Sequence, residues 1–296
     1  MKATAHNIKG YRSVTEALEA SNLLFNPVKV NVQTAPVSLP DGNVVNIDCA
    51  DHCAIVRDDT NTVLSVMGKD YTAFRTDQTF AIADTLMQQK DLELTRAVET
   101  DGGRRIMIEL MGKATKQIGK DTVNETFQIV DSFDGSKKFH IRYGFFRLVC
   151  TNGLMIGEVQ AEMGVRHTKH AQDRLAQALR TYQRAALRMD EVRMRMEALT
   201  QKRVDKAMVE KFIEGLIGKV DEKSSTRKQN QRNDILYRFE HGRGNSGQSA
   251  WDLYNGVVEY YQHIVNPNND DARLASHLFE TGHKQSQKAF ALAESL

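Results

Sequence analysis

An apolar repeat in the second half of the chain constrains the fold more than any other feature of the sequence. Between residues 175 and 199, apolar side chains recur at alternating spacings of three and four, namely Leu175, Ala178, Tyr182, Ala185, Met189, Val192, Met196 and Leu199. Residues at these spacings share one narrow stripe of an α-helix, because the helix turns once every 3.6 residues. The repeat therefore predicts one long helix with a single buried seam, which packs against this chain's own sheet or against a neighbouring subunit.

Short segments rich in β-branched and aromatic residues precede this helix and alternate with glycine-containing turns. Five of them have the composition of strands: Leu92–Val98, Arg104–Leu110, Thr126–Phe133, Lys137–Tyr143 and Phe145–Cys150. The turns between them are short enough for β-hairpins. An antiparallel sheet of such strands must cover one face, and the long helix is the nearest candidate. We therefore expect an α+β fold, with an antiparallel hairpin sheet backed by a long helix.

The rest of the chain divides into an N-terminal and a C-terminal part. A capping pattern at Ser13 and β-branched runs between Val28 and Val66 predict an N-terminal helix and a β-meander. Beyond residue 204 the pattern is helical, in pieces near Val204–Leu216, Thr226–Glu240, Ser249–Val265 and Asp271–Ala293. We predict three domains: residues 1–67, an α+β core at 68–203, and a helical C-terminal region at 204–296.

The composition favours a soluble globular protein. Hydrophobic residues make up 41% of the 296 residues, which is enough for a sizeable core. No apolar run is long enough to predict a membrane span, and the polar segment Met1–Tyr11 lacks the apolar core of a secretory signal. The three cysteines are too few to cross-link a fold of this size. We expect a reducing compartment and no membrane contact.

Three motifs suggest chemistry, and each is better explained by an ordinary structural role. The segment Asp48–Cys53 contains two cysteines and a histidine, but zinc takes four ligands and no second cluster follows. Cys150 and His167 could form a nucleophile pair, yet Cys150 lies in an apolar strand and no third group orients the histidine. The segment Gly112–Lys120 has the wrong glycine spacing for a phosphate-binding loop. We therefore predict no catalytic residues, no metal site and no cofactor.

Basic residues are concentrated around the apolar repeat. Residues 166–203 contain ten lysines and arginines against four acidic residues, a net charge of +6 in a chain whose total is +2. Eight of the ten are arginines, whose planar guanidinium groups bind phosphate and stack on bases. This one-sided excess favours nucleic-acid binding over a merely solvated helix face. The candidate contacts are Arg142, Arg147, Arg166, Lys169, Arg174, Arg180, Arg184, Arg188 and Arg195.

Two of these candidates, Arg142 and Arg147, belong to the predicted sheet, whereas the others lie on the long helix or just before it. A groove between sheet and helix could carry a single strand of DNA, with Phe139 and Tyr143 among the aromatic residues available to stack on bases. The neighbouring Phe145 is better interpreted as a core residue, as is Phe146. Neutralising about five phosphates would give a log–log salt slope of about −3.5 on a single strand.

Five blocks of sequence resemble one known family. They are Gly68–Phe74, Gly102–Ile106, Asp131–Ser136, Phe146–Leu154 and Trp251–Tyr260. In this order they resemble the phage- and plasmid-like domain-of-unknown-function family 932, from about residue 60 to the C-terminus. The resemblance implies a gene beside genes of DNA metabolism and a protein in the cytoplasm of a bacterial host cell, but no catalytic residues. At the level of fold alone, a hairpin sheet backed by a long helix resembles ring-forming single-strand annealing proteins.

Together these features predict a non-enzymatic protein that binds single-stranded DNA or another nucleic acid. It would anneal complementary strands without ATP, as a homo-oligomer. In the alternative interpretation, the arginine-rich face binds an acidic surface of a host or phage protein. A third possibility is an enzyme whose residues meet only in the fold. Binding to phosphates must weaken as salt increases, which separates the first interpretation from the second.

Overall fold

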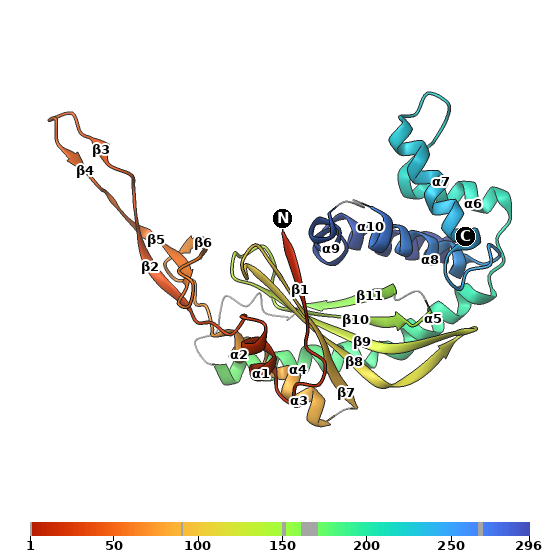
Figure 1. Cartoon of the computed structure of the whole chain (residues 1–296), viewed down its shortest axis with the longest axis horizontal. Helices are drawn as coiled ribbons and strands as arrows, with labels where there is room; N and C mark the ends of the chain where they lie inside the picture. The colour runs from red at the N-terminus through yellow and green to blue at the C-terminus, as the bar shows by residue number, and fades with distance from the viewer. Residues whose placement is uncertain (1, 90, 150–151, 161–170, 266–268) are drawn as a thin grey trace.

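The fold is built on a six-stranded antiparallel sheet (Figure 1). The computed structural model describes residues 2–89, 91–149, 152–160, 171–265 and 269–296. In spatial order the strands are β1 (Ala3–Asn7), β7 (Leu92–Thr100), β8 (Arg105–Ile118), β9 (Asp121–Ser132), β10 (His140–Arg147) and β11 (Asn152–Gln160). From β7 onwards, strands that follow one another in sequence are also neighbours in space, as expected for hairpins.

Two helices lie across one face of this sheet, α4 (Ala171–Leu187) and α5 (Met189–Gln201) (Figure 1). Their seam is buried, and the ring of Tyr182 lies 5.0 Å from that of Phe127 on β9. The apolar seam therefore packs against this chain's own sheet, which was one of the two predicted alternatives. The helix is interrupted at Arg188, so the single long helix of the prediction is two nearly continuous ones.

Helices of the C-terminal region cover the opposite face of the sheet. Leu278 and Phe279 pack against Val98, Met107 and Val130 in a second, smaller core. The helices of this region are α6 (Lys206–Ile217), α7 (Thr226–His241), α8 (Ala250–Glu259), a π-helix (Tyr260–Ile264), α9 (Asp270–Phe279) and α10 (Thr281–Ser295). Because helices pack on both faces, β9 and β10 are buried on both sides.

The N-terminal residues form a ribbon that projects from the body of the molecule (Figure 1). Its base is a three-stranded sheet of β2 (Pro27–Gln33), β5 (Asp48–Arg57) and β6 (Val63–Gly68), in the order β2-β5-β6. Its tip is the short pair β3 (Val37–Ser38) and β4 (Val44–Val45). Three short helices, α1 (Val14–Ala20), α2 (Thr76–Phe80) and α3 (Ile82–Gln89), pack beside the base of the main sheet.

The predicted α+β architecture is confirmed, but two strand assignments are wrong. Residues 145–150 do not form a strand of their own, because β10 runs through Gly144 and the next strand begins at Asn152. Gly144 permits this, since a Cβ there would lie 2.1 Å from the carbonyl oxygen of Leu154 on the paired strand. Likewise β8 and β9 extend to a turn at Gly119, so the glycine-containing segment 112–120 is a hairpin.

The short strand β1 was not predicted, and it joins the N-terminus to the main sheet. Ala3 pairs with Thr100 and Asn7 with Arg96 along β7. The first 67 residues therefore contribute both to the projecting ribbon and to the central sheet. In the described part of the chain, no helix is long and apolar enough to cross a membrane.

Candidate functional site

The two arginines predicted on the sheet do not reach the surface. Arg142 and Arg147 are 1% and 0% exposed, and are among the largest fully buried side chains. Arg142 donates a hydrogen bond to the backbone carbonyl of Leu278, at the end of α9, beneath the helices that cover this face. The prediction assumed that both guanidinium groups face solvent, and their burial contradicts it. Neither residue remains a candidate for phosphate contact.

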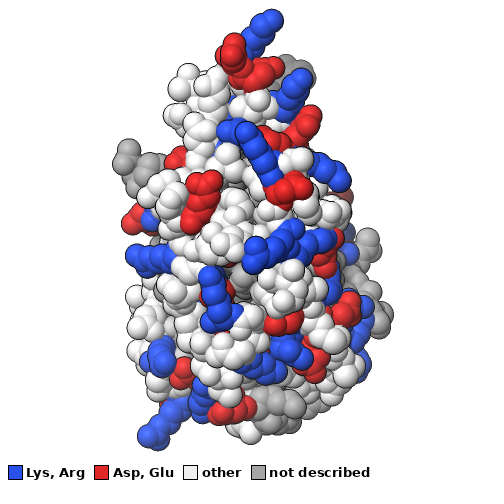
Figure 2. Space-filling model, turned by 90° about the vertical axis from the view of Figure 1, so that its right-hand side faces the viewer, with Lys and Arg blue, Asp and Glu red and all other residues white. Residues whose placement is uncertain are grey.

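The cations of the long helix are only partly free. Arg180 and Arg188 are exposed, and no carboxylate of the described residues pairs with them. Arg184 is half-buried and engaged in a contact. Arg195 forms a two-point ion pair with Glu294 of α10, at 2.7 Å for both nitrogen–oxygen pairs. The predicted excess of basic residues is therefore reduced, among the described residues, to separate exposed arginines. On the face of the molecule in Figure 2, basic and acidic side chains are likewise interspersed.

Three other candidates cannot be placed. Arg166 and Lys169 lie outside the described residues, and the same holds for the side chain of Arg174. The two aromatic residues proposed for stacking on bases, Phe139 and Tyr143, are buried in the core. Phe145 is a core residue, as predicted, whereas Phe146 is half-buried.

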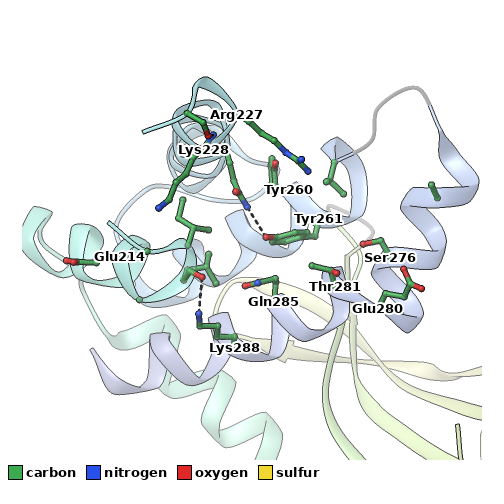
Figure 3. A pocket seen from close by; sticks show the side chains of 18 of the residues that line it. Glu214, Arg227, Lys228, Tyr260, Tyr261, Ser276, Glu280, Thr281, Gln285 and Lys288 are labelled. Carbon is green, nitrogen blue, oxygen red and sulfur yellow. Dashed lines mark hydrogen bonds between the residues drawn. The ribbon is translucent and has the colours of Figure 1, made fainter. Parts of the chain in front are cut away.

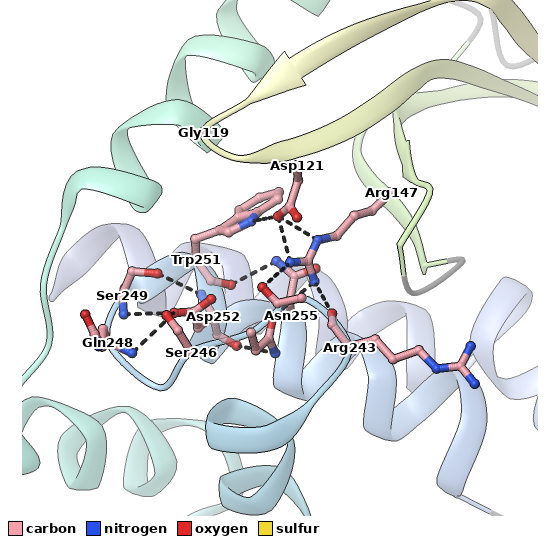
Figure 4. A network of polar contacts seen from close by, with 12 residues as sticks. Gly119, Asp121, Arg147, Arg243, Ser246, Gln248, Ser249, Trp251, Asp252 and Asn255 are labelled. Carbon is pink, nitrogen blue, oxygen red and sulfur yellow. Dashed lines mark hydrogen bonds and ion pairs between the residues drawn. The ribbon is translucent and has the colours of Figure 1, made fainter.

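Arg147 instead organises a buried polar network that joins the sheet to the C-terminal region (Figure 4). Its Nε and Nη2 both lie 2.7 Å from one carboxylate oxygen of Asp121, at the start of β9. The indole Nε1 of Trp251 donates to the same oxygen at 2.7 Å. A buried ion pair is tolerated only where further hydrogen bonds satisfy both groups, and Trp251 supplies one of them.

The Nη1 and Nη2 groups of Arg147 also hold the loop between α7 and α8. They donate to the backbone carbonyls of Arg243 and Gly244 and to the side chain of Asn245, each at 3.0 Å. At the other end of the loop, Asp252 accepts from the backbone of Ser249 in a capping box that begins α8. The loop is thus fixed at both ends, and the Arg243 side chain points out of the network into solvent (Figure 4).

A cavity lies among α6, α7, the π-helix, α9 and α10, and we call it the helical pocket (Figure 3). Its volume of about 850 Å³ is within the range of sites that hold a drug-sized ligand. Polar and aromatic side chains line it, among them Arg227, Lys228, Gln231, Tyr260, Gln285 and Lys288. Glu214 and Glu280 lie at its two ends (Figure 3).

Two of the three cations in the helical pocket are held by the end of α6 and the loop after it. Lys288 donates to the carbonyl of Leu216 at 3.0 Å, and Lys228 donates to the carbonyl of Lys219 at 2.8 Å. Cations are stabilised near a helix C-terminus because the last carbonyls lack partners within the helix. Arg227 is different: it is exposed, no described carboxylate pairs with it, and its side chain lies on the Tyr260 side of the pocket (Figure 3).

The aromatic wall of the helical pocket comes from the π-helix. Tyr260 and Tyr261 pack edge to face, with ring centroids 5.1 Å apart, and Gln231 donates to the Tyr261 hydroxyl at 2.9 Å. Burial raises the pKa of Tyr261 to about 12, so its hydroxyl stays protonated at neutral pH. Burial and then the charge of Asp234 raise the pKa of Tyr260. Single π-turns within helices are frequently found at functional sites.

The helical pocket was not predicted from the sequence. Within the predicted helical piece Ser249–Val265, Trp251 and Tyr254 are buried in the core. Tyr260 and Tyr261 begin the π-helix that follows, and both line the pocket. Within the described residues, no group of three or more His, Cys, Asp or Glu side chains could hold a metal ion.

The comparisons with known proteins identify a family and no individual relative. The family described as a domain of unknown function (DUF932) matches residues 63–290. No curated protein matches the chain, and no solved structure matches it. The fold-level resemblance to single-strand annealing proteins therefore has no support. Because the match spans well over half of the sequence and includes strands β7 to β11, helices α4 and α5 and the helical pocket, the chain belongs to the DUF932 family.

Proposed function

We propose that this protein binds single-stranded nucleic acid and that the helical pocket accommodates one of its nucleotides. The observation that carries the proposal is the combination, in one cavity of about 850 Å³, of a tyrosine wall with an exposed, unpaired arginine at its rim. The base would lie against Tyr260, and the phosphate would face Arg227 and the ammonium group of Lys228. Single-strand sites characteristically combine aromatic surfaces for bases with cations for the backbone.

The polar groups of the helical pocket are compatible with a base. The side-chain oxygen of Gln285 is buried and has no hydrogen-bond partner in the described part of the protein. An unsatisfied buried acceptor is unfavourable, and an amino group of a base would satisfy it. Glu280 and Glu214 can also accept from base amino groups, but they repel phosphate. The phosphate is therefore expected on the Arg227 side.

The exposed arginines of α4 and of the α4–α5 junction would add a sequence-independent attraction. Among the nine basic residues predicted to contact nucleic acid, Arg180 and Arg188 are the described ones that are exposed and form no ion pair with a described carboxylate. Fewer phosphates would be neutralised than the sequence suggested, so the log–log salt slope should be shallower than about −3.5. Annealing of complementary strands without ATP is the activity that such binding would serve in a phage or plasmid setting.

Fluorescence anisotropy with a labelled mixed-sequence oligonucleotide tests the proposal. Tyr260→Ala should weaken binding about 5- to 150-fold, since stacking of one base contributes about 1–3 kcal/mol. Arg227→Glu should weaken binding and reduce the magnitude of the log–log salt slope by roughly 0.7, which is the contribution of one phosphate on a single strand. Lys206→Glu is the matched control, because Lys206 is exposed in the same region and does not line the pocket. Equal losses in the control and in Arg227→Glu would contradict the proposal.

A second candidate function is binding to a protein. It is favoured by Leu187, which is 83% exposed, and Met194, which is 59% exposed, on the same helices as the free arginines. Phosphate-binding surfaces have no need of large apolar side chains, whereas apolar residues and arginines together are typical of protein interfaces. An arginine-rich face of this kind is suited to binding an acidic surface of a host or phage protein, or of another copy of this chain.

A further inference from the structure

The base of the N-terminal ribbon has an apolar surface on its solvent side. The strand registers place Val30, Ala54 and Val66 in one row across β2, β5 and β6, and Val28, Val56 and Val63 in the next row. The opposite side of the same sheet supplies Cys53, Ile55 and Leu64 to the protein core. Side chains alternate between the two faces of a strand, so these two rows cannot share that core. We call them the valine face.

Much of the valine face is open to solvent. Val66 is 55% exposed, Val63 49% and Val30 46%. An antiparallel sheet that leaves one face in water normally carries polar side chains on that face, because an apolar side chain that stays in water contributes no hydrophobic stabilisation. Two adjacent rows of apolar residues on three strands are instead typical of an interaction surface.

The charge of the ribbon limits what can cover the valine face. Residues 27–70 contain six aspartates and three basic residues, a net charge of −3. Nucleic acid would be repelled, and so would the same ribbon of a second copy, since like charges would meet across a symmetric contact. The surface requires a partner that is apolar at its centre and basic around it.

Helices α4 and α5 of another copy meet this requirement. Leu187 and Met194 are exposed apolar residues of these helices, and Arg180 and Arg188 are exposed cations that pair with no carboxylate of the described residues. Residues 171–203 contain eight basic and four acidic residues, a net charge of +4, opposite to that of the ribbon. The ribbon projects away from the body in Figure 1, so it is placed to reach a neighbouring molecule.

We propose that the protein self-associates head to tail, with the valine face of one copy docked on the outer surface of α4 and α5 around Leu187 of the next. Such a contact uses two different surfaces, so it leaves one of each free and can extend into rings or open filaments. It does not use the buried seam of α4 and α5, which packs on the chain's own sheet. Nor does it depend on the helical pocket, although it engages Arg180 and Arg188, which would then not be available to nucleic acid.

A mixing experiment with the full chain tests this geometry. Val66→Glu places a carboxylate in the valine face, and Leu187→Glu does the same on the helix surface. Both side chains are exposed, so circular dichroism should show folded variants. The wild-type protein should associate in native mass spectrometry and in size-exclusion chromatography with light scattering. Each variant alone should associate at least about 30-fold more weakly, as expected for the loss of a central interface residue.

An equimolar mixture of the two variants distinguishes the contact from its alternatives. The Leu187→Glu chain keeps an intact valine face and the Val66→Glu chain keeps an intact helix surface, so the mixture should form a one-to-one dimer. Arg180→Glu together with Arg188→Glu should also weaken wild-type association, and added salt should do so too. A wild-type monomer at all concentrations would overturn the proposal. So would full association of the Leu187→Glu chain alone, which would indicate a symmetric ribbon contact, or a mixture that stays monomeric while the wild type associates.

Discussion

Replacing Arg147 by methionine should destabilise the protein more than any change to its exposed arginines. The substitution keeps an unbranched side chain of similar length but removes the positive charge and every donor. Asp121 is 4% exposed, so its carboxylate would stay buried without the positive charge that balances it. The Trp251 indole would still donate a hydrogen bond to it. The carbonyls of Arg243 and Gly244 would also lose their donor.

The size of the effect follows from the geometry of the network. Removing one member of a buried ion pair costs about 3–5 kcal/mol, because the remaining charge is left without compensation. Domains have a total stability of about 5–15 kcal/mol, so this loss is a large fraction of it. Adding Asp121→Leu to Arg147→Met removes the stranded charge, and the double variant should recover at least about 1 kcal/mol.

Urea denaturation measures these free energies, with circular dichroism as a global signal. The chain contains a single tryptophan, and it lies in the network, so its fluorescence reports directly on the environment of Asp121 and Arg147. The Arg147→Met variant should show a changed emission spectrum before the global transition. A loss of stability below about 1 kcal/mol, or a double variant less stable than the single one, would refute this account of the network.

Three further predictions concern single residues. Gly144→Ala should cost about 3 kcal/mol in urea denaturation, because the new Cβ would meet the Leu154 carbonyl oxygen at 2.1 Å. Arg195→Ala should cost less than about 1 kcal/mol in the same assay, since its ion pair with Glu294 is partly exposed. Burial, followed by the charge of Arg96, holds the pKa of His277 well below its ordinary value. Below about pH 6.5 the unfolded chain therefore binds a proton that the folded chain does not, so stability falls with pH by at most about 1.4 kcal/mol per unit until the folded pKa is reached. His277→Gln should flatten that part of a stability–pH curve, and an unchanged curve would contradict the shift.

Local patterns were sufficient for most of the secondary structure. The spacing of Ala178, Tyr182 and Met189 predicted the buried stripe of α4 and α5, because a helix places such residues on one face whatever lies opposite. Hairpin turns also predicted which strands are neighbours, because a short turn joins two strands that are adjacent in the chain. The helices of the C-terminal region were also recognised, although Asp271–Ala293 is divided at Glu280.

The residues of the candidate site were predicted much less well from the sequence. An arginine on a strand looks the same in sequence whether its face is open or covered, and only the packing of α9 showed that Arg142 is buried. Net charge has the same weakness, because Glu294, which pairs with Arg195, is 99 residues further along the chain. The helical pocket depends on five elements that are separate in sequence.

By itself, then, the sequence determined most of the segments that are helices or strands, and which side of the long helical segment is apolar. These properties depend on neighbours within a few residues, where the backbone geometry fixes the distances. Only the tertiary structure decided which charges are neutralised, that β1 completes the main sheet, and that the valine face stays uncovered. Those outcomes depend on contacts between distant parts of the chain, and electrostatic and hydrophobic energies are set by what each side chain finally lies against.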